Sequence, residues 1–264
     1  TAHLFLHSPI GIKRDKANKV EAFAEPGQSL EGAKKETVIF IEIDRQTSKK
    51  DIDALTQELH SVVDEVSLAV QDWQGMTNTL QDVIKNNGKF NWPVSAEAKK
   101  QTKAYLEWLG DHNFTMMGYR YYDVKAIEGD HRWIPQNDTS LGLLKNSVND
   151  RERLLSRLPA SARAEALSKN PLILTKTNSR ARVHRPAYMD YVGVKVFNKE
   201  GQVVGEHRFL GLYSASFYNN SVTQLPILRE KIKRICELSG FEPGTHAYKA
   251  FANIIETYPR DELL

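Results

Sequence analysis

The segment 176–186 carries the densest group of side chains that could do chemistry. Five cationic or potentially cationic side chains fall within ten residues there. Arginine forks can bind a carboxylate or a phosphate in bidentate fashion, and asparagine and serine add neutral donors. The segment therefore predicts an anion or effector site, or a contact between domains, formed by Lys176, Asn178, Ser179, Arg180, Arg182, His184 and Arg185.

A plainer interpretation of the same segment is a solvated, turn-rich connection between two strands. Its arginines would then pair with acidic residues of a neighbouring module, as surface charges commonly do. Both interpretations stay open at this point.

Motifs of catalytic sites are missing from the sequence. No strand is followed by G-x-G-x-x-G or by a phosphate-binding loop, and no H-E-x-x-H occurs. The single cysteine, Cys236, has no nearby histidine and no second thiol for a zinc site. His3 and His7 share one side of a predicted strand but lack a third ligand. We therefore expect no catalytic residue, no metal and no cofactor within this chain.

Composition limits the possible partners and the compartment. Of 264 residues, 41% are hydrophobic and 26% charged, and 36 basic against 33 acidic side chains leave a net charge of only +3. This balance argues against nucleic acid and membrane surfaces as partners. One cysteine indicates no disulfide framework and favours a reducing, cytosolic compartment. The chain begins with Thr1 rather than methionine, so we expect a piece of a longer protein.

The first part of the sequence predicts three strands and a long helix. The strands are expected at residues 3–10, 20–24 and 38–43, the last a central strand rich in β-branched residues. Apolar residues from Ile52 to Trp73 then recur at helical spacing, and Ser48 offers a capping hydroxyl. One helix on three strands is half of an α/β sandwich, which requires another helix or a partner on the remaining sheet surface.

The rest of the sequence predicts an antiparallel sheet with flanking helices. Gly75 is expected to interrupt the long helix before a short helix at 79–84 and a linker around 86–93, and Ser95 to cap a helix ending near Gly110. Strands are expected at 114–124, 131–134, 141–144, 172–175, 191–197 and 203–213, and helices at 150–158, 160–167, 225–238 and 247–255. This order gives an α+β fold with a PAS-like second domain, and domains at 1–88 and 89–264.

Four phrases, taken in order, resemble a known family. They are Ile41-Glu-Ile-Asp-Arg-Gln-Thr47, Thr175-Lys-Thr-Asn-Ser-Arg180 continuing to His184-Arg-Pro186, Arg208-Phe-Leu-Gly-Leu-Tyr213, and Glu256-Thr-Tyr-Pro-Arg-Asp-Glu-Leu263. Together they are similar to the N-terminal half of the large bacterial NAD-specific glutamate dehydrogenases, from about His3 to Leu264. Four ordered phrases are far more specific than any single one.

The resemblance implies a role for the parent protein. That protein would convert L-glutamate to 2-oxoglutarate and ammonia with NAD, as a large homo-oligomer, with its catalytic and Rossmann-type regions downstream of this segment. Residues 1–88 would form a partial ACT-like α/β sandwich and residues 89–264 a PAS-like domain. The segment would then be a non-catalytic regulatory region that binds an amino-acid effector. The alternatives are a purely architectural role in the oligomer and a stand-alone small-molecule sensor.

Overall fold

The computed structural model describes residues 2–25, 27–145 and 152–260. The chain forms two compact units, Thr1–Leu59 and His60–Leu264, and the division falls within one long helix, α1 (Lys49–Asn86). We call them the N-terminal unit and the sheet unit, and each is described by itself. Within the described ranges, no helix combines the length and the apolar character that crossing a membrane requires.

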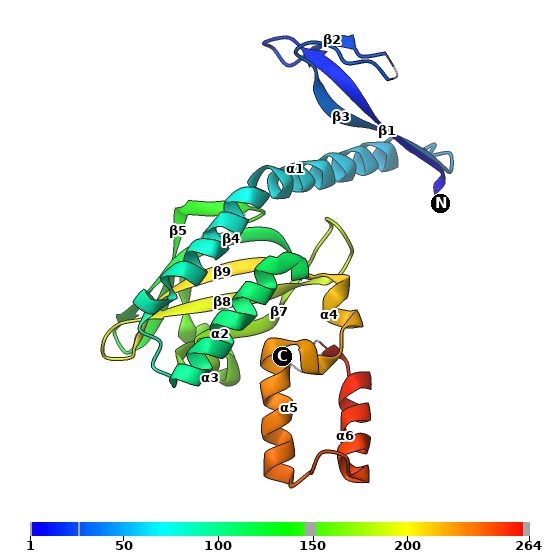
Figure 1. Ribbon diagram of the computed structural model, residues 1–264. Coiled ribbons are helices and arrows are strands. Elements are labelled where there is room, and N and C mark those ends of the chain that lie inside the picture. The colour runs from blue at the N-terminus through cyan, green and yellow to red at the C-terminus, as the bar shows by residue number, and fades with distance from the viewer. Residues whose placement is uncertain (1, 26, 146–151, 261–264) are drawn as a thin grey trace. The chain divides into compact units, whose positions relative to one another are not determined.

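The N-terminal unit contains three antiparallel strands and the start of α1 (Figure 1). The strands are β1 (Ala2–Arg14), β2 (Val20–Phe23) and β3 (Lys34–Ile43), in the order β2-β1-β3. The Ser48 hydroxyl accepts a hydrogen bond from the Asp51 amide at 3.3 Å, which confirms the predicted start of the helix. The prediction that 38–43 is a central strand is wrong, because β3 lies at an edge and β1 pairs on both sides. Residue composition identifies a strand but does not specify its neighbours.

Apolar side chains of the N-terminal unit are widely exposed. Phe5 is 57% exposed and its neighbour Leu6 is 54% exposed. Consecutive side chains of a strand point to opposite faces, so both faces of this sheet present apolar surface. The predicted half sandwich, in which a helix covers one face of the three strands, is therefore not formed in the described part of this unit, because both faces are open.

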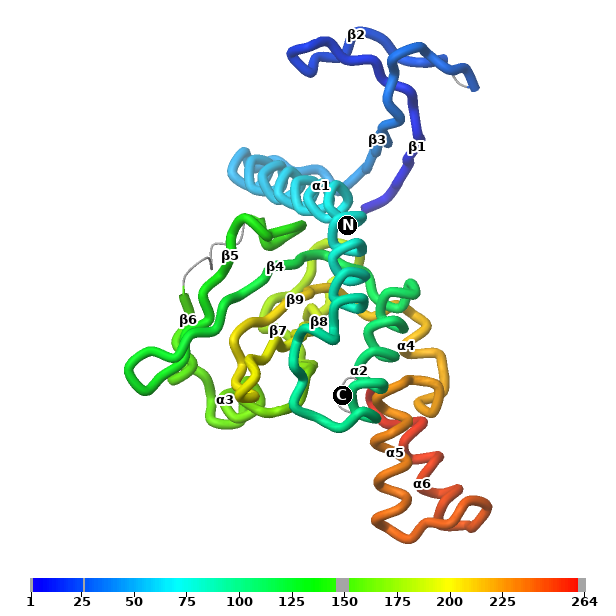
Figure 2. The backbone as a smooth tube through the Cα atoms, turned by 60° about the vertical axis from the view of Figure 1, so that its left-hand side comes forward, coloured from blue at the N-terminus to red at the C-terminus, as the bar shows by residue number. Residues whose placement is uncertain are grey.

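The sheet unit is built on six antiparallel strands that curl into a half-barrel (Figure 2). Their order is β6-β5-β4-β9-β8-β7, which places β4 and β9 in the middle. The strands are β4 (Phe114–Ile127), β5 (Asp130–Gly142), β6 (Arg153–Leu154), β7 (Leu172–Arg180), β8 (Tyr188–Phe197) and β9 (Val203–Tyr213).

Helices cover one face of this sheet (Figure 1). The second half of α1 and the helix α2 (Ala96–Trp108) lie there, and the Ser95 hydroxyl caps α2 by accepting from the Ala98 amide, as predicted. The other helical segments are η1 (Asn87–Phe90), the π-helical turn η2 (Leu109–Asn113), η3 (Leu155–Arg157), α3 (Ala160–Leu167), α4 (Ala215–Asn219), η4 (Val222–Gln224), α5 (Pro226–Ser239) and α6 (His246–Thr257). The described chain is thus a mixed α and β fold with antiparallel sheets.

The main core lies between the sheet and these helices. Leu80 of α1 and Leu106 of α2 pack there, with Val192 and Val194 of β8 and Phe209 of β9, and all five are 0% exposed. The two valines occupy alternate positions of β8 and therefore share one face of the strand.

Gly75 does not interrupt α1. One glycine costs a helix interior only about 1 kcal/mol, which packing on both sides of it can outweigh. Met76 and Leu80, just after it, are fully buried. A Cβ added at Gly75 would meet Leu141 at 3.4 Å, an ordinary van der Waals distance, so the helix also has room for a side chain there. The predicted second helix at 79–84 is therefore the end of the first.

Two further expectations around β5 and β6 differ from the structure. Residues 153–157 of the helix predicted at 150–158 form β6 and the short turn η3, while residues 150 and 151 lie outside the described ranges. The separate strands predicted at 131–134 and 141–144 are one long strand up to Gly142. Residues 137–140, between the two apolar runs, form a bulge in the pairing of β5 with β4, and their polar side chains hid the continuity of the strand.

Burial makes His207 of β9 a source of pH dependence. Burial lowers the pKa of His207 to about 4, and its Nδ1 lies 2.9 Å from the Tyr119 hydroxyl. The unfolded chain binds a proton near pH 6.5 whereas the folded chain does not, so stability falls as pH drops from about 6.5 to about 4. We expect a loss of about 2–3 kcal/mol across this window, measured by urea denaturation. His207→Gln should flatten the profile, and an equally steep profile in that variant would contradict this account.

Candidate functional site

The predicted basic segment spans the end of β7 and the connection to β8. Asn178, Ser179 and Arg180 belong to β7, whereas Arg182, His184 and Arg185 lie in the connection. The connection thus begins later than expected, because the strand predicted at 172–175 continues to Arg180, which pairs with Tyr188.

The arginines of this segment already have partners. Arg182 donates to the Ser61 hydroxyl at 2.7 Å and forms an ion pair with Glu65, both on α1. Arg180 donates to the Pro186 carbonyl at 2.8 Å. The contacts of Arg182 attach the connection to α1, and the contact of Arg180 with Pro186 joins the two ends of the connection.

Lys176 and Arg185 engage the strands instead. Lys176 lies 2.5 Å from the buried carboxylate of Asp190 on β8. Arg185 donates to the Tyr213 carbonyl at 2.9 Å and lies over the ring of Tyr218. The predicted site residues therefore lie on β7 and in the connection, and their contacts are distributed over α1, β8 and β9. Their role as an effector or interdomain site stays a prediction.

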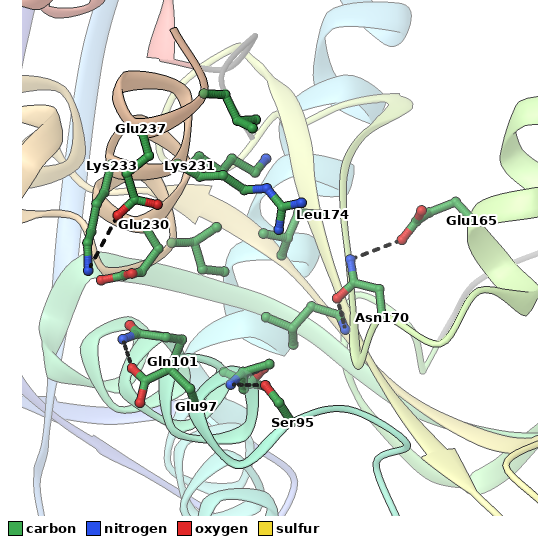
Figure 3. A pocket seen from close by; sticks show the side chains of 16 residues that line it. Ser95, Glu97, Gln101, Glu165, Asn170, Leu174, Glu230, Lys231, Lys233 and Glu237 are labelled. Carbon is green, nitrogen blue, oxygen red and sulfur yellow. Dashed lines mark hydrogen bonds and ion pairs between the residues drawn. The ribbon is translucent and has the colours of Figure 1, made fainter. Parts of the chain in front are cut away.

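A groove of about 1070 Å³ opens between α2, α5, α3 and β7 (Figure 3). Leu172, Leu174 and Ile227 supply apolar surface to it. Its charged lining residues are Glu97, Glu165, Glu230, Lys231, Lys233, Arg234 and Glu237.

The charges of the groove pair mainly with neighbours. Lys233 lies 4.0 Å from Glu237 one turn along α5, and the Asn170 amide donates to Glu165 at 3.2 Å. Burial lowers the pKa of Lys231, while Glu165 acts in the opposite direction. Mixed and paired charges of this kind suit a wet contact surface better than a site for one small ion.

The opposite face of the sheet carries a compact polar cluster. We call it the Arg208 cluster, and its members are Tyr122 of β4, Trp133 of β5, Tyr191 of β8, and Glu206 and Arg208 of β9. Sequence reasoning did not identify this cluster as a site. The sequence feature that could have revealed it is the pair of charged residues, Glu206 and Arg208, at alternate positions of the mainly apolar strand 203–213.

Glu206 is the centre of the cluster. It is 1% exposed, accepts from the Trp133 indole at 2.6 Å and from the Tyr191 hydroxyl, and lies 3.2 Å from Nε of Arg208. Burial and the Glu206 carboxylate raise the pKa of Tyr191, so its phenol stays a donor. The carboxylate thus interacts with donors from three strands, β5, β8 and β9.

Arg208 is fixed in position by its neighbours. Its guanidinium carbon lies 3.8 Å from the ring centroid of Tyr122 and 4.9 Å from that of Tyr191. Nε also approaches the Tyr191 hydroxyl at 3.1 Å. Burial works against the charge, but the Tyr191 and Glu206 oxygens outweigh it and raise the pKa of Arg208. The side chain is therefore a rigid, permanently charged guanidinium.

A buried lysine lies on the same face. Lys195 is 0% exposed, and its ammonium donates to the Glu165 carbonyl at 2.7 Å and to the carbonyl and hydroxyl of Ser168 at 3.0 Å. These groups mark the end of α3, where a cation is favoured by the helix dipole. Burial lowers the pKa of Lys195 to about 8. Its contacts assign it to fixing α3 against the sheet.

The lone cysteine and the two N-terminal histidines form no cluster. Cys236 is a buried free thiol on α5, and His3 lies 2.5 Å from Asp44. Within the described ranges, no group of three His, Cys, Asp or Glu side chains could bind a metal ion.

Comparison with protein families matches both ends of the chain. The ACT1 domain of glutamate dehydrogenase matches residues 1–59, the same residues that form the N-terminal unit. Helical motif 1 of glutamate dehydrogenase matches residues 225–264, which include α5 and α6.

Relatives match along the whole chain. The NAD-specific glutamate dehydrogenase of Halomonas elongata is 30% identical over 266 residues, covering 100% of this chain, and that of Pseudomonas aeruginosa is 30% identical over 99% of it. The NAD-specific glutamate dehydrogenase of Mycobacterium tuberculosis is 25% identical over 78% of it. The chain spans only 16% of the length of the first two relatives and 12% of the third.

The family matches and the identity along the whole chain agree with the resemblance carried by the four sequence phrases. The chain belongs to the large NAD-specific glutamate dehydrogenase family, as part of the N-terminal region of its members.

Proposed function

We propose that this chain is a non-catalytic regulatory and assembly segment of an NAD-dependent glutamate dehydrogenase. The parent protein would convert L-glutamate, NAD and water to 2-oxoglutarate, ammonia and NADH, as a cytosolic homo-oligomer, and would bind its NAD outside this segment. Within the segment, residues 1–88 would act as a partial ACT-like domain and residues 89–264 as a PAS-like domain.

One observation carries this proposal. The ACT1 match ends at residue 59, where the N-terminal unit also ends, so sequence similarity and compact structure delimit the same piece. A piece of this size that is separate from the sheet unit can respond to an effector by a change of position, and such a change is a common form of regulation.

The regulatory role is tested on the complete enzyme. Calorimetry with a panel of amino acids other than glutamate should detect binding by at least one of them, and the same compound should change the rate of glutamate oxidation. Deleting residues 1–59 should abolish the change in rate and leave the basal rate measurable. A complete enzyme that binds none of the panel, and whose rate none of them alters, would contradict the regulatory role.

A second candidate function is purely architectural, and the exposed stripe of α1 favours it. Val63, Val70 and Trp73 are 59%, 62% and 53% exposed, although the sequence predicted this stripe to be the apolar face of the helix. Contiguous exposed apolar surface commonly marks a protein interface.

The architectural candidate makes its own prediction for the assembled enzyme. Val70→Glu should lower the mass of the oligomer in light scattering, because a charge would then enter an apolar interface. Lys199→Glu changes an exposed residue of the β8–β9 turn and is the matched control. Unchanged mass in both variants would count against a role of this stripe in assembly.

A further inference from the structure

The Arg208 cluster has a feature that its internal contacts do not use. Nε of Arg208 faces Glu206 and Tyr191, but the two terminal nitrogens, Nη1 and Nη2, donate to no residue in the described part of the chain. Neither nitrogen is a fully buried atom without a partner, and the side chain is 11% exposed. The outer edge of this guanidinium is therefore partly accessible to solvent.

The geometry of this edge suits one chemical class of ligand. The Tyr122 ring lies 3.8 Å from the guanidinium carbon, and Nε is engaged by Glu206 and Tyr191, so the two terminal nitrogens are the donors left in the guanidinium plane. Two parallel N–H donors in that plane match the two oxygens of a carboxylate. Side-chain entropy has already been lost on folding, because the contacts with Glu206 and the rings fix the rotamer.

Two residues lie directly opposite Arg208 on the neighbouring strands, Gly193 on β8 and Arg120 on β4. Gly193 lies directly opposite Arg208 in the β8–β9 register, and a Cβ there would meet Glu206 Oε1 at 3.0 Å. Arg120 lies directly opposite Arg208 on β4, so a second guanidinium lies on the same face. The Arg120 side chain is engaged elsewhere, because its Nε donates to the Ser140 hydroxyl at 2.7 Å and its Nη2 to the Leu144 carbonyl.

We propose that Arg208, flanked by Tyr122 and Tyr191, binds the carboxylate of a small organic acid or amino acid on the face of the sheet away from α1 and α2. This site deepens the proposed regulatory function, on which it rests, by naming where an effector carboxylate binds. It is separate from the predicted basic segment.

The test is amide hydrogen exchange of the complete enzyme, read by mass spectrometry on peptides from β4 and β9. Succinate and L-aspartate should slow exchange in these peptides, whereas succinamide, which has the same length without the charges, and sodium chloride at equal ionic strength should not. Inorganic phosphate should protect them at least tenfold more weakly. No protection by either carboxylate in the wild-type enzyme, or equal protection by succinamide or phosphate, overturns the proposal.

Variants assign the effect to the arginine. Arg208→Lys keeps the charge but not the fork and should weaken binding at least tenfold, while Arg182→Lys, in the basic segment, should leave it unchanged. Hydrogen exchange of Arg208→Lys measured without ligand shows whether the sheet of this variant is intact. If it is not intact, the comparison of carboxylates with succinamide and phosphate in the wild-type enzyme still decides the proposal. Unchanged protection in Arg208→Lys would also overturn it.

The readout separates this proposal from the regulatory function. If amino acids change the rate of the enzyme but leave β4 and β9 exchange unaltered, the site is wrong and the regulatory function stands. If succinate protects these strands while no amino acid changes the rate, the site stands and the regulatory function is wrong.

Discussion

Replacing Glu206 with alanine is expected to lower the free energy of unfolding of the sheet unit by about 3–5 kcal/mol, because it leaves a buried charge without its partner. Arg208 would lose its ion pair, and the Trp133 indole and the Tyr191 hydroxyl would lose their acceptor. Urea denaturation followed by circular dichroism measures the change. Carboxylate binding should weaken as well, since Glu206 helps to fix the rotamer of Arg208.

Two comparisons make the Glu206 result specific. Glu237→Ala removes a carboxylate that is 65% exposed and should change stability by less than about 0.5 kcal/mol. The double variant Glu206→Leu and Arg208→Met removes both charges and should be more stable than Glu206→Ala, since apolar pairs often replace buried ion pairs without loss. If the double variant is as unstable as Glu206→Ala, then the unpaired charge of Arg208 is not the cause of the stability loss.

Replacing Phe209 with alanine is expected to cost about 3–5 kcal/mol of unfolding free energy. Phe209 is 0% exposed on β9, in the middle of the sheet, and its ring centroid lies 5.0 Å from that of Tyr119. The variant loses the apolar burial of the ring and leaves a cavity that strands paired on both sides cannot close. The same denaturation experiment measures it.

The control for Phe209 is an apolar truncation on the surface. Leu238 of α5 is 79% exposed, so Leu238→Ala should change stability by less than about 0.5 kcal/mol. Similar losses in the two variants would contradict the assignment of Phe209 to the core.

Local signals in the sequence predicted elements well where one signal dominated. The capping residue Ser95 predicted the start of α2, and the strand expected at 191–197 is β8. The predictions failed where packing outweighed a local signal. Gly75 weakens a helix on its own, but the buried contacts of Met76 and Leu80 continue α1 through it.

The site shows a similar division. The basic segment was visible in the sequence because its charges are adjacent, and the structure distributes their contacts over several elements. The Arg208 cluster was not visible, because its five residues lie on β4, β5, β8 and β9. Only strand register brings Tyr122, Trp133 and Tyr191 to Glu206.

By itself, the sequence determined the family and most of the helices and strands, because four ordered phrases and local periodicity are properties of the linear chain. The tertiary structure alone decided the order of the strands, the exposure of the α1 stripe and the position of Arg208. Each of these depends on contacts between residues far apart in the sequence. Such contacts follow from how sheets pair and pack, which no local pattern specifies.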